Sequence, residues 1–323
     1  GSATPGSSTL TFKVSDGISF GSGTTTFSLT FGPDYTSATE SILRPSSNGG
    51  YHYFGSDIEI NSDATYAIIG ADRDTQGTGQ NKGAAYVYTR SGSTWTEQAK
   101  LVASDTQYND YFGGSVSISE DGMYAIAGAR QEDGGAGDPV NNAGAAYVYV
   151  RSGSTWTQQA KLTASNAGAY YSFGLSVSIN GDGTYALVSS GGGAVSGGGV
   201  VYVFTRSGST WTEQAVLEAS DAQAQPSDNF GHDIEVNSDA TYAIIAAQLA
   251  GCGIGAAYIF TRSGSTWTQQ ARLNPSIPNG NTSTQTNSVS MNSDCSTVVL
   301  GCSYHASSIS NYAGLAYIFI RSG

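Results

Sequence analysis

Arg-Ser-Gly-Ser-Thr-Trp-Thr at residues 90–96 recurs at residues 151–157, 206–212 and 262–268, and a further copy begins at Arg321. The repeated segments lie about 55–60 residues apart along a chain of 323 residues. Self-similarity at a fixed spacing is the mark of an array of one supersecondary unit. The sequence therefore predicts one closed array in place of several unrelated domains.

One repeat, residues 112–162, predicts four strands in succession. Residues 115–119 alternate apolar and polar side chains, which is the period of a half-buried strand, and a Glu-Asp-Gly turn follows. Residues 124–129 form a second and almost wholly apolar run. Residues 144–150 and 155–162, joined by the Arg-Ser-Gly-Ser turn, complete the unit.

The same pattern starts at Phe54, Phe173 and Phe230, and in weaker form near Asn287. Within each repeat the inner runs are small and apolar, and the fourth run is polar and carries the tryptophan. A propeller blade has this gradient, because it is buried near the axis and wet at the rim. We therefore predict an all-β fold, a β-propeller of four-stranded antiparallel blades.

Ring closure and blade number follow from the two ends of the sequence. The last repeat stops before its fourth strand, and residues 37–43 align with the fourth strand at residues 95–101. A terminal strand that completes the last blade would remove exposed edges. We predict a propeller over residues 37–323 with five blades, closed by this N-terminal strand. Residues 1–36 are then an added hairpin or the remains of a sixth blade.

Composition limits the possible partners. The net charge is −12 and Lys and Arg number only 13, so the clustered cations that bind nucleic acid are missing. No apolar run approaches the ~20 residues that span a bilayer. Few lysines, many Ser, Thr and Gly, and one glycosylation sequon at Asn281 favour an extracellular or cell-surface protein.

The three cysteines cannot all be paired within the chain. Cys295 and Cys302 bracket one predicted strand and so lie too far apart for a disulfide. Cys252 and Cys302 follow equivalent strands of neighbouring repeats and are the more reasonable pair. We expect mostly free, buried thiols.

The repeat resembles the FG-GAP repeat, the blade unit of integrin α-chain propellers and of many microbial surface proteins. Phe173-Gly174, residues 180–183 with the sequence Asn-Gly-Asp-Gly, and Gly70-Ala71 carry the resemblance. It extends over roughly residues 38–323 and implies a propeller.

The resemblance also implies calcium, which integrin-type blades bind in the turn between strands one and two. Here the closing aspartate of that pattern is replaced by Ala67 and Ala243, so we favour plain hairpin turns with solvated acids. No cofactor is required, and Ca²⁺ is the one candidate. The corresponding candidate ligands are Glu59, Asn61, Asp63, Glu235, Asn237 and Asp239.

Two further sets of residues are candidates for a partner or ligand surface. The four tryptophans present indole faces that suit a sugar ring, although packing of the outer strand explains them more simply. The loops after each second strand vary most and carry acidic residues, as a binding surface on a rigid scaffold does. The candidates are Trp95, Trp156, Trp211, Trp267, Asp72, Asp74, Glu132, Asp133 and Asp138.

Catalytic motifs are scarce. The three histidines, His52, His232 and His305, lack metal-ligand spacing, and no Gly-x-Ser-x-Gly elbow occurs. Carboxylate pairs across the axis, residues 57 and 59 with residues 233 and 235, would form a couple of the glycosidase kind, yet they recur by repeat copying.

We therefore predict that the chain is not an enzyme. The predicted function is a non-catalytic extracellular module for adhesion, recognition or surface assembly that binds a protein or glycan through one propeller face. The alternatives are a lectin-like propeller and a structural subunit of a surface filament or coat that assembles with copies of itself.

Overall fold

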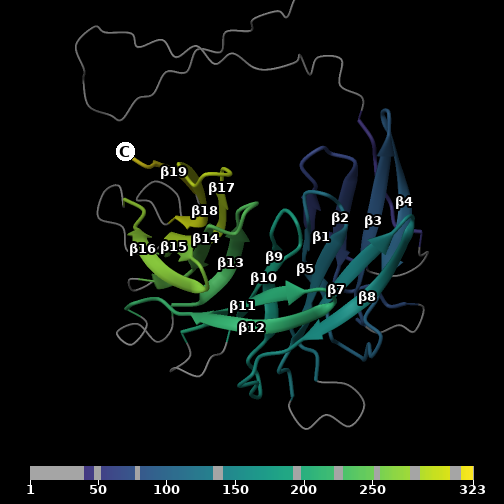
Figure 1. Ribbon diagram of the computed structural model, residues 1–323, viewed down its shortest axis with the longest axis horizontal. Coiled ribbons are helices and arrows are strands. Elements are labelled where there is room, and N and C mark those ends of the chain that lie inside the picture. Colours follow the sequence, from purple (N-terminus) through teal and green to yellow (C-terminus); the bar gives the residue numbers. More distant parts are fainter. Residues whose placement is uncertain are drawn as a thin grey trace, which may run out of the picture. The chain divides into compact units, whose positions relative to one another are not determined.

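The computed structural model describes residues 40–46, 52–76, 81–133, 141–191, 198–221, 228–250, 255–276, 284–305 and 314–322. Contacts divide the chain into two units, residues 1–43 and 44–323. The second unit consists of five antiparallel sheets arranged as a β-propeller, so the predicted fold class is confirmed (Figure 1). The predicted boundary at residue 37 stays a prediction, and residues 1–36 lie outside the described residues.

Each sheet, here called a blade, takes its strands in sequence order. Blades 1 and 2 are β1 (Phe54–Ile60), β2 (Tyr66–Ala71), β3 (Ala84–Ser91), β4 (Thr94–Leu101), β5 (Phe112–Ile118), β6 (Tyr124–Ala129), β7 (Ala145–Ser152) and β8 (Thr155–Leu162). Blades 3 and 4 are β9 (Phe173–Ile179), β10 (Tyr185–Ser190), β11 (Val200–Ser207), β12 (Thr210–Leu217), β13 (Phe230–Val236), β14 (Tyr242–Ala247), β15 (Ala256–Ser263) and β16 (Thr266–Leu273). Blade 5 is β17 (Thr284–Met291), β18 (Thr297–His305) and β19 (Leu315–Ile320).

Blade 5 has three strands, and the fourth strand predicted from residues 37–43 is not found among the described residues. Residues 40–45 lie in no strand, and residues 37–39 lie outside the described part. Pro45 follows at once and has no N–H to donate to a sheet. Arg44 and Ser46 instead contact blade 1, since the Arg44 carbonyl accepts from Tyr88 Oη at 2.6 Å and Ser46 Oγ donates to Glu97 at 2.6 Å.

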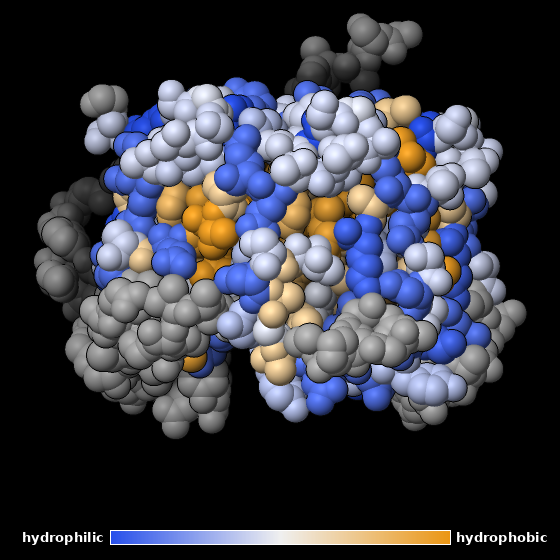
Figure 2. Space-filling model, turned by 60° about the horizontal axis from the view of Figure 1, so that its bottom comes forward, coloured by the Kyte–Doolittle hydropathy of each residue, from blue (hydrophilic) through white to orange (hydrophobic). Residues whose placement is uncertain are grey.

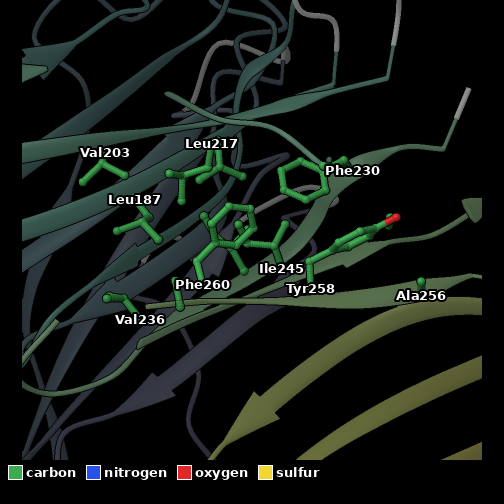
Figure 3. Packing of buried hydrophobic residues seen from close by; sticks show 14 of the residues in the cluster. Leu187, Val203, Leu217, Phe230, Val236, Ile245, Ala256, Tyr258 and Phe260 are labelled. Carbon is green, nitrogen blue, oxygen red and sulfur yellow. The ribbon is translucent and has the colours of Figure 1, made fainter. Parts of the chain in front are cut away.

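Neighbouring blades pack face to face through apolar clusters. Between blades 3 and 4, Leu187, Val203 and Leu217 of one sheet meet Phe230 and Ile245 of the next (Figure 3). The alternation that the sequence shows explains this, because every second residue of an inner strand points into such a cluster.

The phenylalanine that opens each repeat anchors the boundary between blades. Phe173 is fully buried and lies 5.4 Å, ring centre to ring centre, from Tyr202. Its amide donates to the Ala143 carbonyl of the preceding blade at 2.9 Å. Gly144 bridges to the same residue with a φ of 83°, and a Cβ there would lie 2.1 Å from the Phe173 carbonyl oxygen.

The outward sides of the first and last blades remain apolar and uncovered by described residues. Ile58 of blade 1 is 69% exposed, and Ile318 of blade 5 is 67% exposed. At the other boundaries, the equivalent residues are buried, for example Val116 in β5. Elsewhere polar groups dominate, and Figure 2 shows apolar side chains in recesses between polar ridges on one face.

Two of the three cysteines, Cys295 and Cys302, are free and buried, which confirms the prediction for this pair. Cys252 and the sequon residue Asn281 lie outside the described residues. No helix within the described ranges is long and apolar enough to cross a membrane.

Candidate active site

The innermost strands of the blades hold one another together through side chains. Asp57 Oδ2 accepts from the Val116 amide at 2.7 Å, and Glu59 Oε2 accepts from the Ile118 amide at 2.6 Å. A buried amide without a partner would cost free energy comparable to a lost hydrogen bond. These carboxylates therefore supply acceptors that a neighbouring strand would supply within a sheet.

Serine does the same in blades 2 and 3, and carboxylates return in blade 4. Each acceptor bonds to the amide of an inner-strand residue in the next blade. The pairs are Ser115 with Val177 at 3.1 Å, Ser117 with Ile179 at 3.0 Å, Ser178 with Val236 at 3.1 Å, Asp233 with Val289 at 2.8 Å, and Glu235 with Met291 at 3.0 Å.

The carboxyl groups of blades 1 and 4 influence one another. Burial raises the pKa of Glu59 to about 7, hydrogen bonds from Ser117 and Ile118 oppose the shift, and the charges of Asp57 and Glu235 add to it. Burial likewise raises the pKa of Asp233 to about 6, and the Asp57 charge contributes. Blades 1 and 4 are not neighbours in the sheet order, so these charges interact across the propeller axis.

Burial also raises the pKa values of the other two members of the group. The hydrogen bonds that Asp57 accepts from Val116 and Glu235 accepts from Met291 oppose the shift without cancelling it. Asp57, Glu59, Asp233 and Glu235 are called the channel carboxyls below. Their charges interact with one another from blades 1 and 4, and all four have pKa values above those of ordinary carboxylates.

A cavity of about 220 Å³ opens at the channel end where the inner strands turn. Glu59 and Glu235 both line it, and the surrounding groups are amides and hydroxyls, including those of Asn61, Asn237 and Ser178. Typical ligand pockets measure about 300–1,000 Å³, so this one suits a small molecule or one end of a longer one.

Glu120 of blade 2 also lines the cavity and connects to blade 4. Its Oε2 accepts from Ser238 Oγ at 2.8 Å, and the Glu120 carbonyl accepts from Asn61 Nδ2 of blade 1 at 3.1 Å. Three blades thus fix the cavity rim. No sequence pattern singles out Glu120, because it lies in a turn where acidic residues are common.

The candidate calcium ligands lie in two different places. Glu59 points into the channel, whereas Asp63 Oδ1 accepts from the Thr65 amide at 2.9 Å and from its hydroxyl at 2.6 Å. Asn61 Oδ1 accepts from the amides of Thr65 and Tyr66 at 3.0 and 2.8 Å. The oxygens of the turn therefore close the turn itself.

Blade 4 repeats this arrangement. Asp239 Oδ1 accepts from the Thr241 amide at 2.9 Å, Asn237 Oδ1 accepts from Tyr242 at 2.8 Å, and Glu235 points into the channel. Among the described residues no three His, Cys, Asp or Glu side chains are grouped to hold a metal ion. Calcium in these turns stays a prediction.

The acidic loop residues are largely buried and paired with cations. Asp74 is fully buried and receives hydrogen bonds from Tyr86 and from Lys100 Nζ, the latter 3.0 Å away. Burial acts to raise the pKa of Asp74, but the hydrogen bonds from Tyr86, Gln76 and Lys100 outweigh it, so the pKa lies below its ordinary value. Asp74 is therefore not part of an open acidic rim, because its carboxylate is buried and neutralised by Lys100.

Three other predicted loop residues also have partners within the protein, two of them cationic side chains and one a backbone amide. Asp72 lies 3.6 Å from Arg130, Glu132 lies 2.8 Å from Lys161, and Asp133 accepts from the Asn142 amide at 2.5 Å. Asp138 lies outside the described residues. Partner binding on this face stays a prediction.

The tryptophans belong to the boundaries between blades. Trp156 packs on the cluster between blades 1 and 2, and its Nε1 donates to Gln98 at 2.9 Å. Trp211 and Trp267 hold the equivalent places at the next two boundaries. Trp95 stands at the outer side of blade 1, with Arg90 5.9 Å above its ring. Packing accounts for three of the four indoles.

The FG-GAP repeat model matches three copies in the chain, at residues 38–88, 95–149 and 156–204. The chain belongs to the FG-GAP repeat family. No curated protein sequence matches this FG-GAP propeller.

Several solved propellers resemble it in structure. The periplasmic gluconolactonase of Pseudomonas aeruginosa is 15% identical with a TM-score of 0.52, over 76% of this chain and 64% of that one. Hydrazine synthase of Kuenenia stuttgartiensis is 10% identical with a TM-score of 0.55, over 88% and 67%. The GH74 enzyme of Niastella koreensis is 16% identical with a TM-score of 0.50, over 83% and 37%.

These neighbours correct the functional prediction. They are enzymes, so the prediction of a non-catalytic adhesion, lectin-like or coat module, and the prediction that the chain is not an enzyme, are wrong on this comparison. The prediction relied on missing linear motifs. In a propeller, groups that meet at the axis come from different blades, as Glu59 and Glu235 do here, and leave no such motif.

Proposed function

We propose that this FG-GAP propeller is a hydrolase that cleaves a C–O bond of a small, uncharged, sugar-derived substrate in the channel cavity. One observation carries the proposal: Glu59 and Glu235, from opposite blades, line the same cavity, and the pKa of Glu59 is about 7. A carboxyl group that retains its proton near neutral pH, beside a second carboxyl group, provides the pair that acid and base catalysis of hydrolysis needs.

Glu59 is the proton donor and Glu235 the proton acceptor in this scheme. At neutral pH a large fraction of Glu59 is protonated, so it can donate to the oxygen that leaves. Glu235 takes a proton from water as the water oxygen bonds to the carbon under attack. The C–O bond to the leaving oxygen breaks, and the two carboxyl groups end with exchanged protonation states that solvent resets.

The lining of the cavity favours an uncharged polar ligand. Asn61, Asn237 and Ser178 make the wall polar but already bond within the protein, so a ligand would bond chiefly to the carboxyl groups of Glu59, Glu120 and Glu235. Glu120 and Glu235 line the cavity and can carry negative charge, which disfavours phosphorylated or carboxylated substrates. Neutral glycosides and neutral sugar lactones are both uncharged, carry hydroxyl groups and contain a C–O bond that water can cleave.

The structural neighbours support the proposal only through their fold, because they are 10–16% identical to this chain. One of them is a gluconolactonase, which makes a neutral lactone a sensible first substrate. This chain spans 64% of that neighbour, so substrate identity belongs to the proposal.

The experiment assays the full chain against p-nitrophenyl glycosides and against δ-gluconolactone, which separates the two substrate classes. Glu59→Gln and Glu235→Gln should each lower kcat/KM by about 100-fold or more, the usual contribution of a general acid or base. Glutamine still offers an oxygen to the Ile118 and Met291 amides, so folding should persist. Glu218→Gln is the matched control, because Glu218 is exposed, directly follows the outermost strand of blade 3 and does not line the cavity.

Hydrolysis of neither class by the wild-type chain would overturn the proposal. Full activity in Glu59→Gln, with unchanged melting temperature, would also overturn the assigned roles. Activity that falls in Glu218→Gln as well would point to general instability and contradict a local effect.

We also propose that the protein works outside the cytoplasm, in the periplasm or beyond the cell. The support is the FG-GAP repeat, the periplasmic setting named for the gluconolactonase, and a composition poor in lysine. Immunodetection in periplasmic and secreted fractions of the source cells tests this, and a purely cytoplasmic signal would contradict it.

A further inference from the structure

One hydrogen bond at the rim of the channel cavity passes over a whole blade. Glu120 Oε2 of blade 2 accepts from Ser238 Oγ of blade 4 at 2.8 Å. Blade 3 lies between them, since its inner strand contacts those of blades 2 and 4. Both residues line the cavity, and Glu120 is exposed. This pair, called the rim bond below, therefore lies at the solvent side of the cavity.

Blade 3 leaves room for the rim bond because it has a glycine where the other blades carry a side chain. The second residue after the inner strand is serine in blades 1, 4 and 5, glutamate in blade 2 and glycine in blade 3. A Cβ on Gly181 would lie 2.5 Å from Ser238 Oγ and 2.9 Å from Glu120 Oε2. The φ of Gly181 is not in the positive range that favours glycine, so space accounts for this glycine.

The backbones at both ends of the rim bond are held in place. The Glu120 carbonyl accepts from Asn61 Nδ2 at 3.1 Å. The Ser238 carbonyl accepts from Asn180 Nδ2 at 3.1 Å and from the Gly181 amide at 3.0 Å. Exposed side chains change rotamer quickly, so the Glu120 carboxylate can exchange Ser238 for another donor while the turns stay unchanged.

Glu120 is also the carboxylate of the cavity wall with the most acceptor capacity left for a ligand. Glu59 and Glu235 each accept from a backbone amide of the next blade, at 2.6 and 3.0 Å. Within the described part of the chain, the side chain of Glu120 accepts from the Ser238 hydroxyl alone. The two oxygens of a carboxylate can accept several hydrogen bonds, so most of this capacity remains.

We propose that Glu120 is the specificity residue of the channel cavity, because its carboxylate can leave Ser238 and accept hydrogen bonds from two adjacent hydroxyl groups of the ligand. One bond to a serine is then exchanged for two to a diol, which favours a ligand with neighbouring hydroxyls over one with a single hydroxyl. The inference rests on the proposed function for its ligand class, a neutral sugar derivative. It assigns the diol to Glu120 and leaves Glu59 and Glu235 for the bond that is cleaved.

The experiment measures binding without turnover. The probe is 1,5-anhydroglucitol, which has adjacent ring hydroxyls and neither a glycosidic nor a lactone bond, titrated against the full chain by isothermal calorimetry at pH 7. Saturable one-to-one binding is expected. Tetrahydropyran-2-methanol, the same ring with a single hydroxyl, should bind about tenfold more weakly or less.

The two ends of the rim bond should respond in opposite directions. Glu120→Gln keeps the size of the side chain but has one acceptor oxygen and no charge, so it should weaken probe binding about tenfold. Ser238→Ala removes the competing donor, so it should tighten binding about two- to fivefold. Glu218→Gln, outside the cavity, should leave binding unchanged. The melting temperature of each variant checks that it is folded.

Weaker binding in both Glu120→Gln and Ser238→Ala, or a change in neither, would overturn the proposal. Absence of probe binding, or equal binding of tetrahydropyran-2-methanol, would overturn it as well. The proposed function is tested separately. Hydrolysis with a KM that Glu120→Gln leaves unchanged would overturn the role of Glu120 alone, whereas probe binding through Glu120 without hydrolysis of either substrate class would overturn the proposed function alone.

Discussion

At the residue scale, Glu59 has two roles, one in joining blades and one in holding a proton, and both follow from its position. Its carboxylate bonds to the amide of the next blade, and its burial near Asp57 and Glu235 raises its pKa to about 7. The side chain thereby joins two blades and also stays partly protonated at neutral pH. Serine at the same place in blade 2 provides only the first of these properties.

Stability should fall as pH rises from about 4.5 to about 7. In that window folded Glu59 holds a proton that an unfolded glutamate, with a pKa near 4.5, has released. The folded state binds more protons, so the free energy of unfolding decreases with pH, by at most about 1.4 kcal/mol per pH unit for one group. Urea unfolding at several pH values measures this.

Glu59→Gln should flatten that dependence, and Glu218→Gln should leave it unchanged. Asp57, Asp233 and Glu235 titrate in the same direction, so some slope should remain in Glu59→Gln. A wild-type stability that rises between pH 4.5 and 7 would contradict the pKa assigned to Glu59.

The sequence predicted much at this scale, and its failures have physical causes. Period-two alternation placed Val116 and Ile118 on the buried face of their strand and the residues that alternate with them on the other face. It did not show that Glu59 and Glu235 share a cavity, since that depends on how blades 1 and 4 curve around the axis. Reading Glu59 with Asp63 as one ligand set ignored that the strand directs the first into the channel.

At the element scale, the fourth strand of each blade closes the boundary with the preceding blade. In blades 2 to 4 its tryptophan packs across that boundary, and Gln98 and Gln159, in blades 1 and 2, accept from the indole N–H of the blade that follows. The sequence motif that revealed the fold is therefore a packing device. Trp95 has no described blade before it, which makes it a natural control.

Trp156→Ala should lower the free energy of unfolding by about 2–4 kcal/mol, in the range for removing a large aromatic side chain. Trp95→Ala should cost less than about 1 kcal/mol, because Trp95 joins no described boundary cluster. Chemical denaturation of both variants measures the difference. Equal losses would contradict a boundary role for Trp156.

Gly144→Ala should destabilise the protein by about 1–3 kcal/mol more than Gly153→Ala, because overpacking against backbone carries such a cost. Both glycines have positive φ, at 83° and 61°, so both variants share the cost of that conformation. Only at Gly144 would the new Cβ lie 2.1 Å from the Phe173 oxygen, while nothing lies within 4 Å at Gly153. Thermal unfolding distinguishes them, and equal melting temperatures would contradict the close contact.

At the scale of the whole propeller, stability is distributed unevenly among the blades. Blades 2, 3 and 4 pack on both faces, while the outward face of blade 5 exposes Ile318 and Val299. Blade 5 also has three strands in the described structure. Fewer packed neighbours mean a lower free energy for local opening.

Amide hydrogen exchange should therefore be faster in β17–β19 than in β9–β11. The inner strands of blade 3 lie between two sheets and should exchange only near global unfolding. Exchange measured by mass spectrometry on proteolytic fragments compares the two blades directly. Equal protection would show that blade 5 is covered as fully as blade 3.

The acceptors along the channel make the propeller tolerant of new chemistry. Ser115, Ser117 and Ser178 accept hydrogen bonds from backbone amides, as Asp57 and Glu59 do. A hydroxyl and a carboxylate can therefore make the same link between blades. A duplicated blade can exchange one for the other and alter the charge of the axis without loosening the ring. The remaining serines are therefore positions where further carboxyl groups can be introduced by design while the bond to the next blade is kept.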